Sequence, residues 1–170
     1  MQTPFAAPLI FTGKEWLTDH TIVVNDSFVE SLLPRHRVPS NLEPEVFPDC
    51  MIIPGFIDLQ VYGADKRLLG AFPDVETLET MSREFIHQGT VLFLPTLATN
   101  DPIIFKKGIA AIRSFWEKKG KGVFGIHLEG PWINSSKKGA HAEEWIHAPT
   151  LQEVKELLHY GSGVITMITL

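Results

Sequence analysis

The chain has 170 residues, of which 44% are hydrophobic and 21% charged, and both fractions are ordinary for a folded protein with a sizeable core. Its 15 Lys and Arg residues stand against 20 Asp and Glu residues, giving a net charge of -5, which argues against nucleic acid or an anionic membrane as a partner. The single cysteine cannot form an internal disulfide, and neither a signal peptide nor a bilayer-spanning apolar run is visible, so a cytoplasmic protein is predicted.

Residues 1–50 have the pattern of a small β region. Short runs of apolar and β-branched residues predict three strands there: 9–11, 21–24 and 27–33. The Asn25-Asp26 pair between the last two runs favours a hairpin. Four prolines within 34–48 predict a loop.

From residue 51 onward, apolar strands alternate with amphipathic helices. The strands are predicted at 56–60, 91–94, 123–128 and 164–168. The first helix is predicted after a cap at Asp74, and the second has Pro102 in its first turn. The third opens with Thr150 and Glu153, which have the spacing of a capping box.

This alternation predicts an α/β fold with a parallel sheet covered by helices. The strand spacing is close to one strand-helix unit each time, so both a doubly wound sheet and part of a TIM barrel fit. Hydrophobic periodicity cannot separate these two folds. In either case, functional side chains are expected at the carboxyl ends of the strands.

Three polar residues lie at or after such strand ends: Gln60, Glu129 and His141. A carboxylate at Glu129 can bind a divalent cation or act as an acid or base, although a loop carboxylate that caps a turn or pairs with a lysine is at least as common. A loop histidine such as His141 is more often an ordinary hydrogen-bonded residue, and Gln60 fits ligand orientation and surface polarity equally well. His127 lies inside a strand, where a satisfied core histidine is the better interpretation.

Two motifs resemble a known family. Residues 54–58, PGFID, resemble the segment with which amidohydrolases enter the first barrel strand. Residues 127–132, HLEGPW, followed by 137–141, KKGAH, resemble the signature of the N-acetylglucosamine-6-phosphate deacetylases. The first motif marks only the superfamily, whereas the second, with its spacing, is specific to the family. The likeness runs over essentially the whole chain.

The resemblance implies a (β/α)8 TIM barrel beside a small β-sandwich. Residues 1–50 would form the N-terminal part of the sandwich, and 51–170 the first four strand-helix units of the barrel. The implied reaction is hydrolysis of the N-acetyl amide of N-acetylglucosamine 6-phosphate to glucosamine 6-phosphate and acetate. One divalent metal ion, commonly zinc, would activate water and polarise the carbonyl. The implied partners are the phosphosugar and, for the full-length protein, a second subunit in a homodimer.

By motif match, Glu129 would be a metal ligand, and Ala140 and His141 would contact the phosphosugar. Gln60 stands where related amidohydrolases carry the second histidine of a His-x-His metal pair. Some deacetylases have Gln at that position and keep one metal ion, so a mononuclear site is expected. The family's catalytic aspartate is expected beyond Leu170, so no catalytic residue is assigned here and these residues alone are expected to be inactive.

Two alternatives remain at this stage. The chain could belong to another amidohydrolase, such as a deaminase or a cyclic amidase, although the signature from Glu129 to His141 argues against it. It could also be a non-catalytic half-barrel that binds itself or a partner, because four barrel strands leave two unpaired edges.

Overall fold

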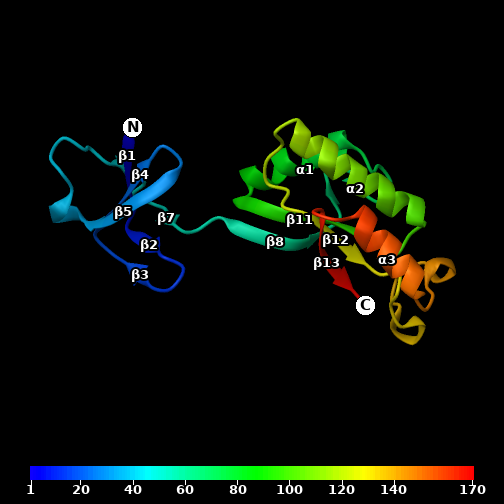
Figure 1. The fold of residues 1–170 in the computed structure, drawn as a ribbon. Helices are drawn as coiled ribbons and strands as arrows, with labels where there is room; N and C mark the ends of the chain where they lie inside the picture. The colour runs from blue at the N-terminus through cyan, green and yellow to red at the C-terminus, as the bar shows by residue number, and fades with distance from the viewer. The chain divides into compact units, whose positions relative to one another are not determined.

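A computed structural model describes residues 1–170, which form two compact units, Met1–Pro54 and Gly55–Leu170 (Figure 1). The boundary lies four residues after the expected one at residue 50, because strand β7 (Met51–Ile52) pairs in parallel with β2 (Leu9–Phe11) of the first unit. This short strand therefore belongs to the first unit, and not to the larger one as expected.

The first unit holds two small sheets, with strand orders β5-β4-β1-β6 and β3-β2-β7. Its other strands are β1 (Gln2–Ala6), β3 (Trp16–Leu17), β4 (His20–Asn25), β5 (Phe28–Pro34) and β6 (Glu45–Val46). The predicted hairpin is confirmed, because β4 and β5 pair antiparallel across a turn in which Asp26 has a φ of 53°. The predicted loop at 34–48 is wrong in part, since it holds a 3-10 helix (Arg35–Arg37) and β6, which pairs with β1. A strand as short as β6 leaves no period in the sequence, so the prolines dominated the prediction.

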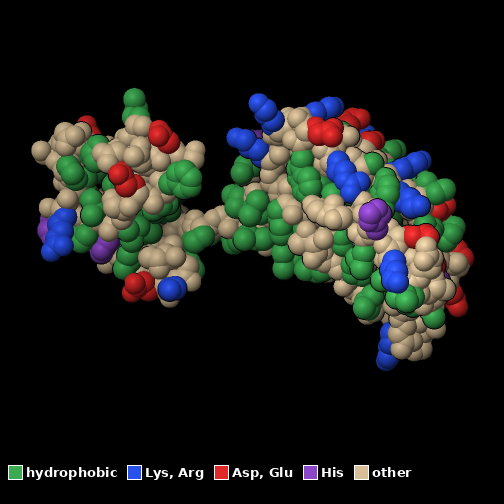
Figure 2. Space-filling view, in the orientation of Figure 1, with side chains coloured by type: hydrophobic (Ala, Val, Ile, Leu, Met, Phe, Trp, Pro, Cys, Tyr) green, Lys and Arg blue, Asp and Glu red, His purple; other side chains and the backbone are tan.

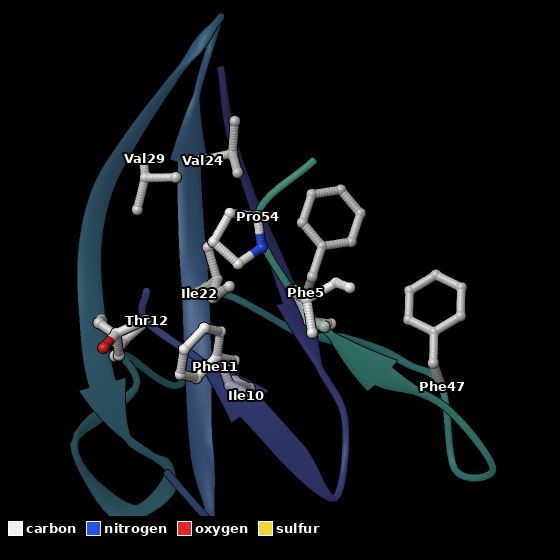
Figure 3. A pocket seen from close by; sticks show the side chains of 12 residues that line it. Phe5, Ile10, Phe11, Thr12, Ile22, Val24, Val29, Phe47 and Pro54 are labelled. Carbon is white, nitrogen blue, oxygen red and sulfur yellow. The ribbon is translucent and has the colours of Figure 1, made fainter. Parts of the chain in front are cut away.

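An apolar hollow of about 620 Å³ lies within the first unit. Figure 3 shows the rings of Phe5, Phe11 and Phe47 among its lining residues, of which only Thr12 is polar. Because no titratable side chain lines this hollow, it offers neither an acid or base nor a strong metal ligand. The residues singled out from the sequence all lie in the second unit.

The second unit is built on a parallel sheet with the strand order β8-β11-β12-β13. These strands are β8 (Phe56–Val61), β11 (Thr90–Ala98), β12 (Ile126–Glu129) and β13 (Ile165–Thr169). A small hairpin, β9 (Gly63–Ala64) and β10 (Arg67–Leu68), follows β8. The predicted α/β class is confirmed. Each strand lies beside the strand that precedes it in the chain, so this sheet lacks the reversal of order that marks a doubly wound fold.

Three α-helices connect the strands, and Figure 1 shows α1 and α2 on the same side of the sheet. They are α1 (Val75–His87), α2 (Pro102–Glu117) and α3 (Leu151–Tyr160), and the loop after β12 adds two 3-10 helices, η2 (Ser135–Lys137) and η3 (Glu143–Trp145). The predicted caps are confirmed: Asp74 accepts from a backbone N–H of α1, and Thr150 and Glu153 form both bonds of the capping box. None of the helices has the length and apolar character that crossing a membrane requires.

The core of the second unit lies between the helices and the sheet. Its fully buried side chains include Leu78, Met81, Phe93, Leu97, Ile109, Ile112, Ile126 and Leu128. Outside this core, hydrophobic side chains gather over β8 and the start of β11 (Figure 2), where Phe56, Ile57, Leu59, Val91 and Leu92 are exposed. Along β8, polar side chains at Asp58 and Gln60 alternate with apolar ones, as the two-residue period of a strand requires.

Strand β11 is longer than predicted, and the extension reaches the functional end of the sheet. The apolar run predicted a strand over 91–94, and the next residue, Pro95, cannot donate to a strand ladder. The strand nevertheless continues to Ala98, with an irregular register between Phe93 and Pro95. The Val61 N–H donates to the Thr96 hydroxyl at 3.0 Å, so a side chain replaces a backbone acceptor at the irregularity.

Candidate functional site

Glu129 lies at the carboxyl end of β12, where the sequence placed it, and its side chain is 19% exposed. One carboxylate oxygen accepts a hydrogen bond from the Gln60 amide at 3.0 Å, and the other accepts from the Tyr62 hydroxyl at 2.5 Å. Both donors come from the end of β8, which is separated from β12 in the sheet by β11. The structure therefore brings together Gln60 and Glu129, which the sequence proposed separately.

The three side chains form a closed set of hydrogen bonds. Besides donating to Glu129, the Gln60 amide nitrogen donates to the Tyr62 hydroxyl oxygen at 2.7 Å. An amide NH2 has two hydrogens, so Gln60 can make both bonds at once. Partial burial, followed by the hydrogen bond to Glu129, raises the pKa of Tyr62, so at neutral pH its hydroxyl keeps the hydrogen that it donates.

His141 approaches Glu129 from the loop that follows β12. Its Nδ1 lies 2.8 Å from the Thr99 hydroxyl, and its Nε2 lies 3.6 Å from a carboxylate oxygen of Glu129. The Thr99 hydroxyl also donates to the Glu129 backbone carbonyl at 3.2 Å. Because that hydroxyl has one hydrogen, His141 is the donor in their shared bond. His141 is therefore held through Nδ1, and its Nε2 faces the Glu129 carboxylate.

The other two residues considered from the sequence, Ala140 and His127, differ in exposure. Ala140 is exposed on the same loop, directly before His141. His127 is 2% exposed and lies inside the sheet, where Nε2 meets the Thr169 hydroxyl at 2.8 Å and Nδ1 meets the Leu59 carbonyl at 3.1 Å. The interpretation of His127 as a satisfied core histidine is confirmed.

Sequence reasoning missed two members of this group, Tyr62 and Thr99. Tyr62 follows Gln60 by two residues, and that period places both side chains on one face of an extended chain. Thr99 directly follows β11, which extends four residues beyond the predicted strand 91–94. Tyr62 also lines a hollow of about 540 Å³ at the same end of the sheet, with Leu68, Gly70, Ala71, Thr96, Ala98 and Asn100.

The fit to a metal ion is partial. Residues 1–170 contain no group of three or more His, Cys, Asp or Glu side chains that could hold an ion. A catalytic zinc takes about three protein ligands and a water molecule. Glu129 has the chemistry of one such ligand: it is acidic, it lies at a strand end, and the hydrogen bonds from Gln60 and Tyr62 fix its orientation.

The chain is similar to known proteins in both sequence and structure. The family described as the NagA composite domain matches residues 7–45. The N-acetylglucosamine-6-phosphate deacetylase of Haemophilus influenzae is 30% identical over 162 residues, which cover 95% of this chain and 42% of that protein. The crystal structure of the same enzyme from Pasteurella multocida matches with a TM-score of 0.86 and 31% identity, over 100% of this chain and 45% of that one.

The chain is similar to the N-terminal part of N-acetylglucosamine-6-phosphate deacetylases. The resemblance predicted from the two motifs is thereby confirmed. The chain spans 42% of the length of the first curated relative that it matches. A related protein of Shewanella, an N-acetylgalactosamine-6-phosphate deacetylase, is 32% identical over 119 residues, which cover 70% of this chain and 30% of that protein.

Proposed function

We propose that this chain is the N-terminal part of a metal-dependent deacetylase. The enzyme would hydrolyse the N-acetyl amide of N-acetylglucosamine 6-phosphate and release glucosamine 6-phosphate and acetate. The observation that carries this proposal is the placement of Glu129, held by Gln60 and Tyr62 with His141 beside it, in a chain similar to these deacetylases over 95% of its length.

Glu129 would be the ligand that this chain contributes to a single divalent ion, zinc in our proposal. A bound zinc supplies Lewis acidity, which polarises the amide carbonyl and lowers the pKa of water. Gln60 orients Glu129 and offers an amide where related enzymes offer an imidazole, which favours one ion over two. The other metal ligands and a catalytic aspartate would come from the part of the relatives that this chain does not match.

His141 and Ala140 would bind the phosphosugar. With Nδ1 held by Thr99, Nε2 of His141 would be the atom that hydrogen-bonds to a sugar hydroxyl. Ala140 is exposed on the same loop, so its backbone can approach the sugar closely. Both assignments follow the motif match, and the position of His141 next to Glu129 supports them.

For the architecture, we propose that the second unit is the first half of a TIM barrel and the first unit part of a β-sandwich. Four parallel strands in consecutive order support a barrel arc. Residues 1–170 alone would lack most of the metal site and would be inactive. A cytoplasmic location and a homodimer remain predictions.

The proposal is tested by replacing Glu129 with Gln in the full-length protein. This change keeps the size of the side chain and removes its charge, so we expect loss of bound metal, measured by elemental analysis. The rate of acetate release should fall on the order of a thousandfold, since metal-based charge stabilisation is worth several kcal/mol. Glu79→Gln is the matched control, because Glu79 is exposed on α1, away from the site. Unchanged metal content in Glu129→Gln would refute the assignment.

The same assay decides between two substrates. The Shewanella relative acts, by its name, on N-acetylgalactosamine 6-phosphate, so the wild-type kcat/KM should be compared for the two epimers. We expect N-acetylglucosamine 6-phosphate to be preferred, because the Haemophilus and Pasteurella enzymes match nearly the whole chain. A preference for the galactose epimer would move the proposal to that substrate, and activity only on cyclic amides or amino-purines would refute it.

A further inference from the structure

Tyr62 makes the shortest hydrogen bond to the proposed metal ligand. Its hydroxyl donates to Glu129 at 2.5 Å, while Gln60 donates to the other oxygen at 3.0 Å. Hydrogen bonds to an ionised acceptor are shorter and stronger than those between neutral groups. The short distance is therefore that expected for a phenol that donates to a carboxylate.

Two contacts fix the backbone at and just after Tyr62. The Tyr62 backbone carbonyl accepts a hydrogen bond from the Leu69 N–H at 2.8 Å. The next residue, Gly63, begins the β9–β10 hairpin, and a Cβ atom there would lie 1.9 Å from the Arg67 carbonyl oxygen. The hairpin thus closes tightly on the chain just after Tyr62, which fixes the backbone position from which the phenol reaches Glu129.

We propose that Tyr62 is a positioning residue that orients Glu129 for binding the metal ion. The inference rests on the proposed function, and it adds a residue to the proposed site. Each carboxylate oxygen has two lone-pair sites, so the bonds from Tyr62 and Gln60 leave one site on each oxygen for a cation. Both donors are neutral, so they fix the carboxylate without adding a charge that competes with the ion. A group of this kind raises metal affinity by reducing the freedom that the ligand loses on binding.

The test is Tyr62→Phe in the full-length protein, with zinc affinity as the main measurement. The variant keeps the ring and removes only the hydroxyl. We expect the apparent Kd for zinc, measured by competition with a chromophoric chelator, to rise about 10- to 100-fold, as for other groups that hydrogen-bond to metal ligands. At saturating zinc, much of kcat should return and KM for the phosphosugar should stay near the wild-type value.

Tyr160→Phe is the matched control, because its hydroxyl bonds to the Lys106 carbonyl at 3.3 Å and does not contact Glu129. Gln60→Met removes the other donor while the phenol stays, and it should weaken zinc binding by a smaller factor because its bond is longer. If Tyr62→Phe fails to fold, Tyr62→Leu, which also lacks the hydroxyl, takes its place. The inference is overturned if the folded Tyr62 variant binds zinc as tightly as the wild type while Glu129→Gln loses it. If Glu129→Gln also keeps its zinc, the proposed function itself fails.

Discussion

Gly130 should be essential for the geometry next to Glu129, and Gly130→Ala should show it. Its φ of +88° lies in the region that disfavours a side chain, and an added Cβ would lie 2.2 Å from the Thr99 hydroxyl oxygen. Thr99 is 5% exposed, so it has little room to move away. Its hydroxyl joins the Glu129 carbonyl to His141, and a displaced Thr99 would therefore break the contact that orients His141.

The expected cost has two parts. A left-handed conformation costs a residue with a Cβ atom about 1–2 kcal/mol. Loss of the two hydrogen bonds of Thr99 adds about 1 kcal/mol each, so the free energy of unfolding should fall by about 3–4 kcal/mol in total. Gly139→Ala separates the two parts, because Gly139 also has a positive φ, of +57°, but no atom lies within 4 Å of its added Cβ. That variant should lose only about 1–2 kcal/mol.

The measurement is urea unfolding of the full-length protein, followed by tryptophan fluorescence. The chain has four tryptophans, one of which, Trp132, lies two residues from Gly130. The two variants should differ by about 2 kcal/mol, which corresponds to about a 30-fold difference in the unfolding equilibrium. Equal destabilisation by Gly130→Ala and Gly139→Ala would refute the argument that the Thr99 contact fixes this turn.

Two further predictions concern histidines. His141→Ala should raise KM for the phosphosugar by a factor of about 2 to 12, the loss expected for one hydrogen bond to a sugar hydroxyl, and should leave zinc content unchanged. Unaltered kinetics would make His141 an ordinary surface residue. The Trp145 carbonyl, followed by Glu153, raises the pKa of His147 above its ordinary value of 6.5, so the stability from this pair is fully present below pH 6.5 and is lost as pH rises through the raised pKa. In an NMR titration, Glu153→Gln should lower the pKa of His147 toward 6.5, and an identical titration curve would contradict the role of Glu153.

The elements of the second unit were predictable because their signals are local. Asp74 and the Thr150–Glu153 pair cap helices through bonds that reach three residues along the chain. Alternation of strands and helices then fixes an α/β class without any knowledge of distant contacts. Gln60 and Glu129 were placed at strand ends by the same local reasoning, but their contact with each other was not predicted.

The contacts that build the site are not local, and the sequence therefore left them open. Tyr62 meets Glu129 across 67 positions of the chain, and Thr99 meets the Glu129 carbonyl across 30. Whether such residues meet depends on strand order and register, which periodicity does not determine. For this reason Glu129 alone was as compatible with a turn-capping carboxylate as with a metal ligand.

The register of β8 is the step that connects fold and site. Pro95 removes one backbone donor from β11, and at this point the Val61 N–H donates to the Thr96 hydroxyl instead of a backbone carbonyl. Val61 lies between Gln60 and Tyr62, so the bond that holds Val61 also holds the backbone of its two neighbours. A shift of one residue there would turn both donors to the other face of the strand and away from Glu129. The irregularity at Pro95 is thus accommodated in the way that keeps both donors directed at the carboxylate.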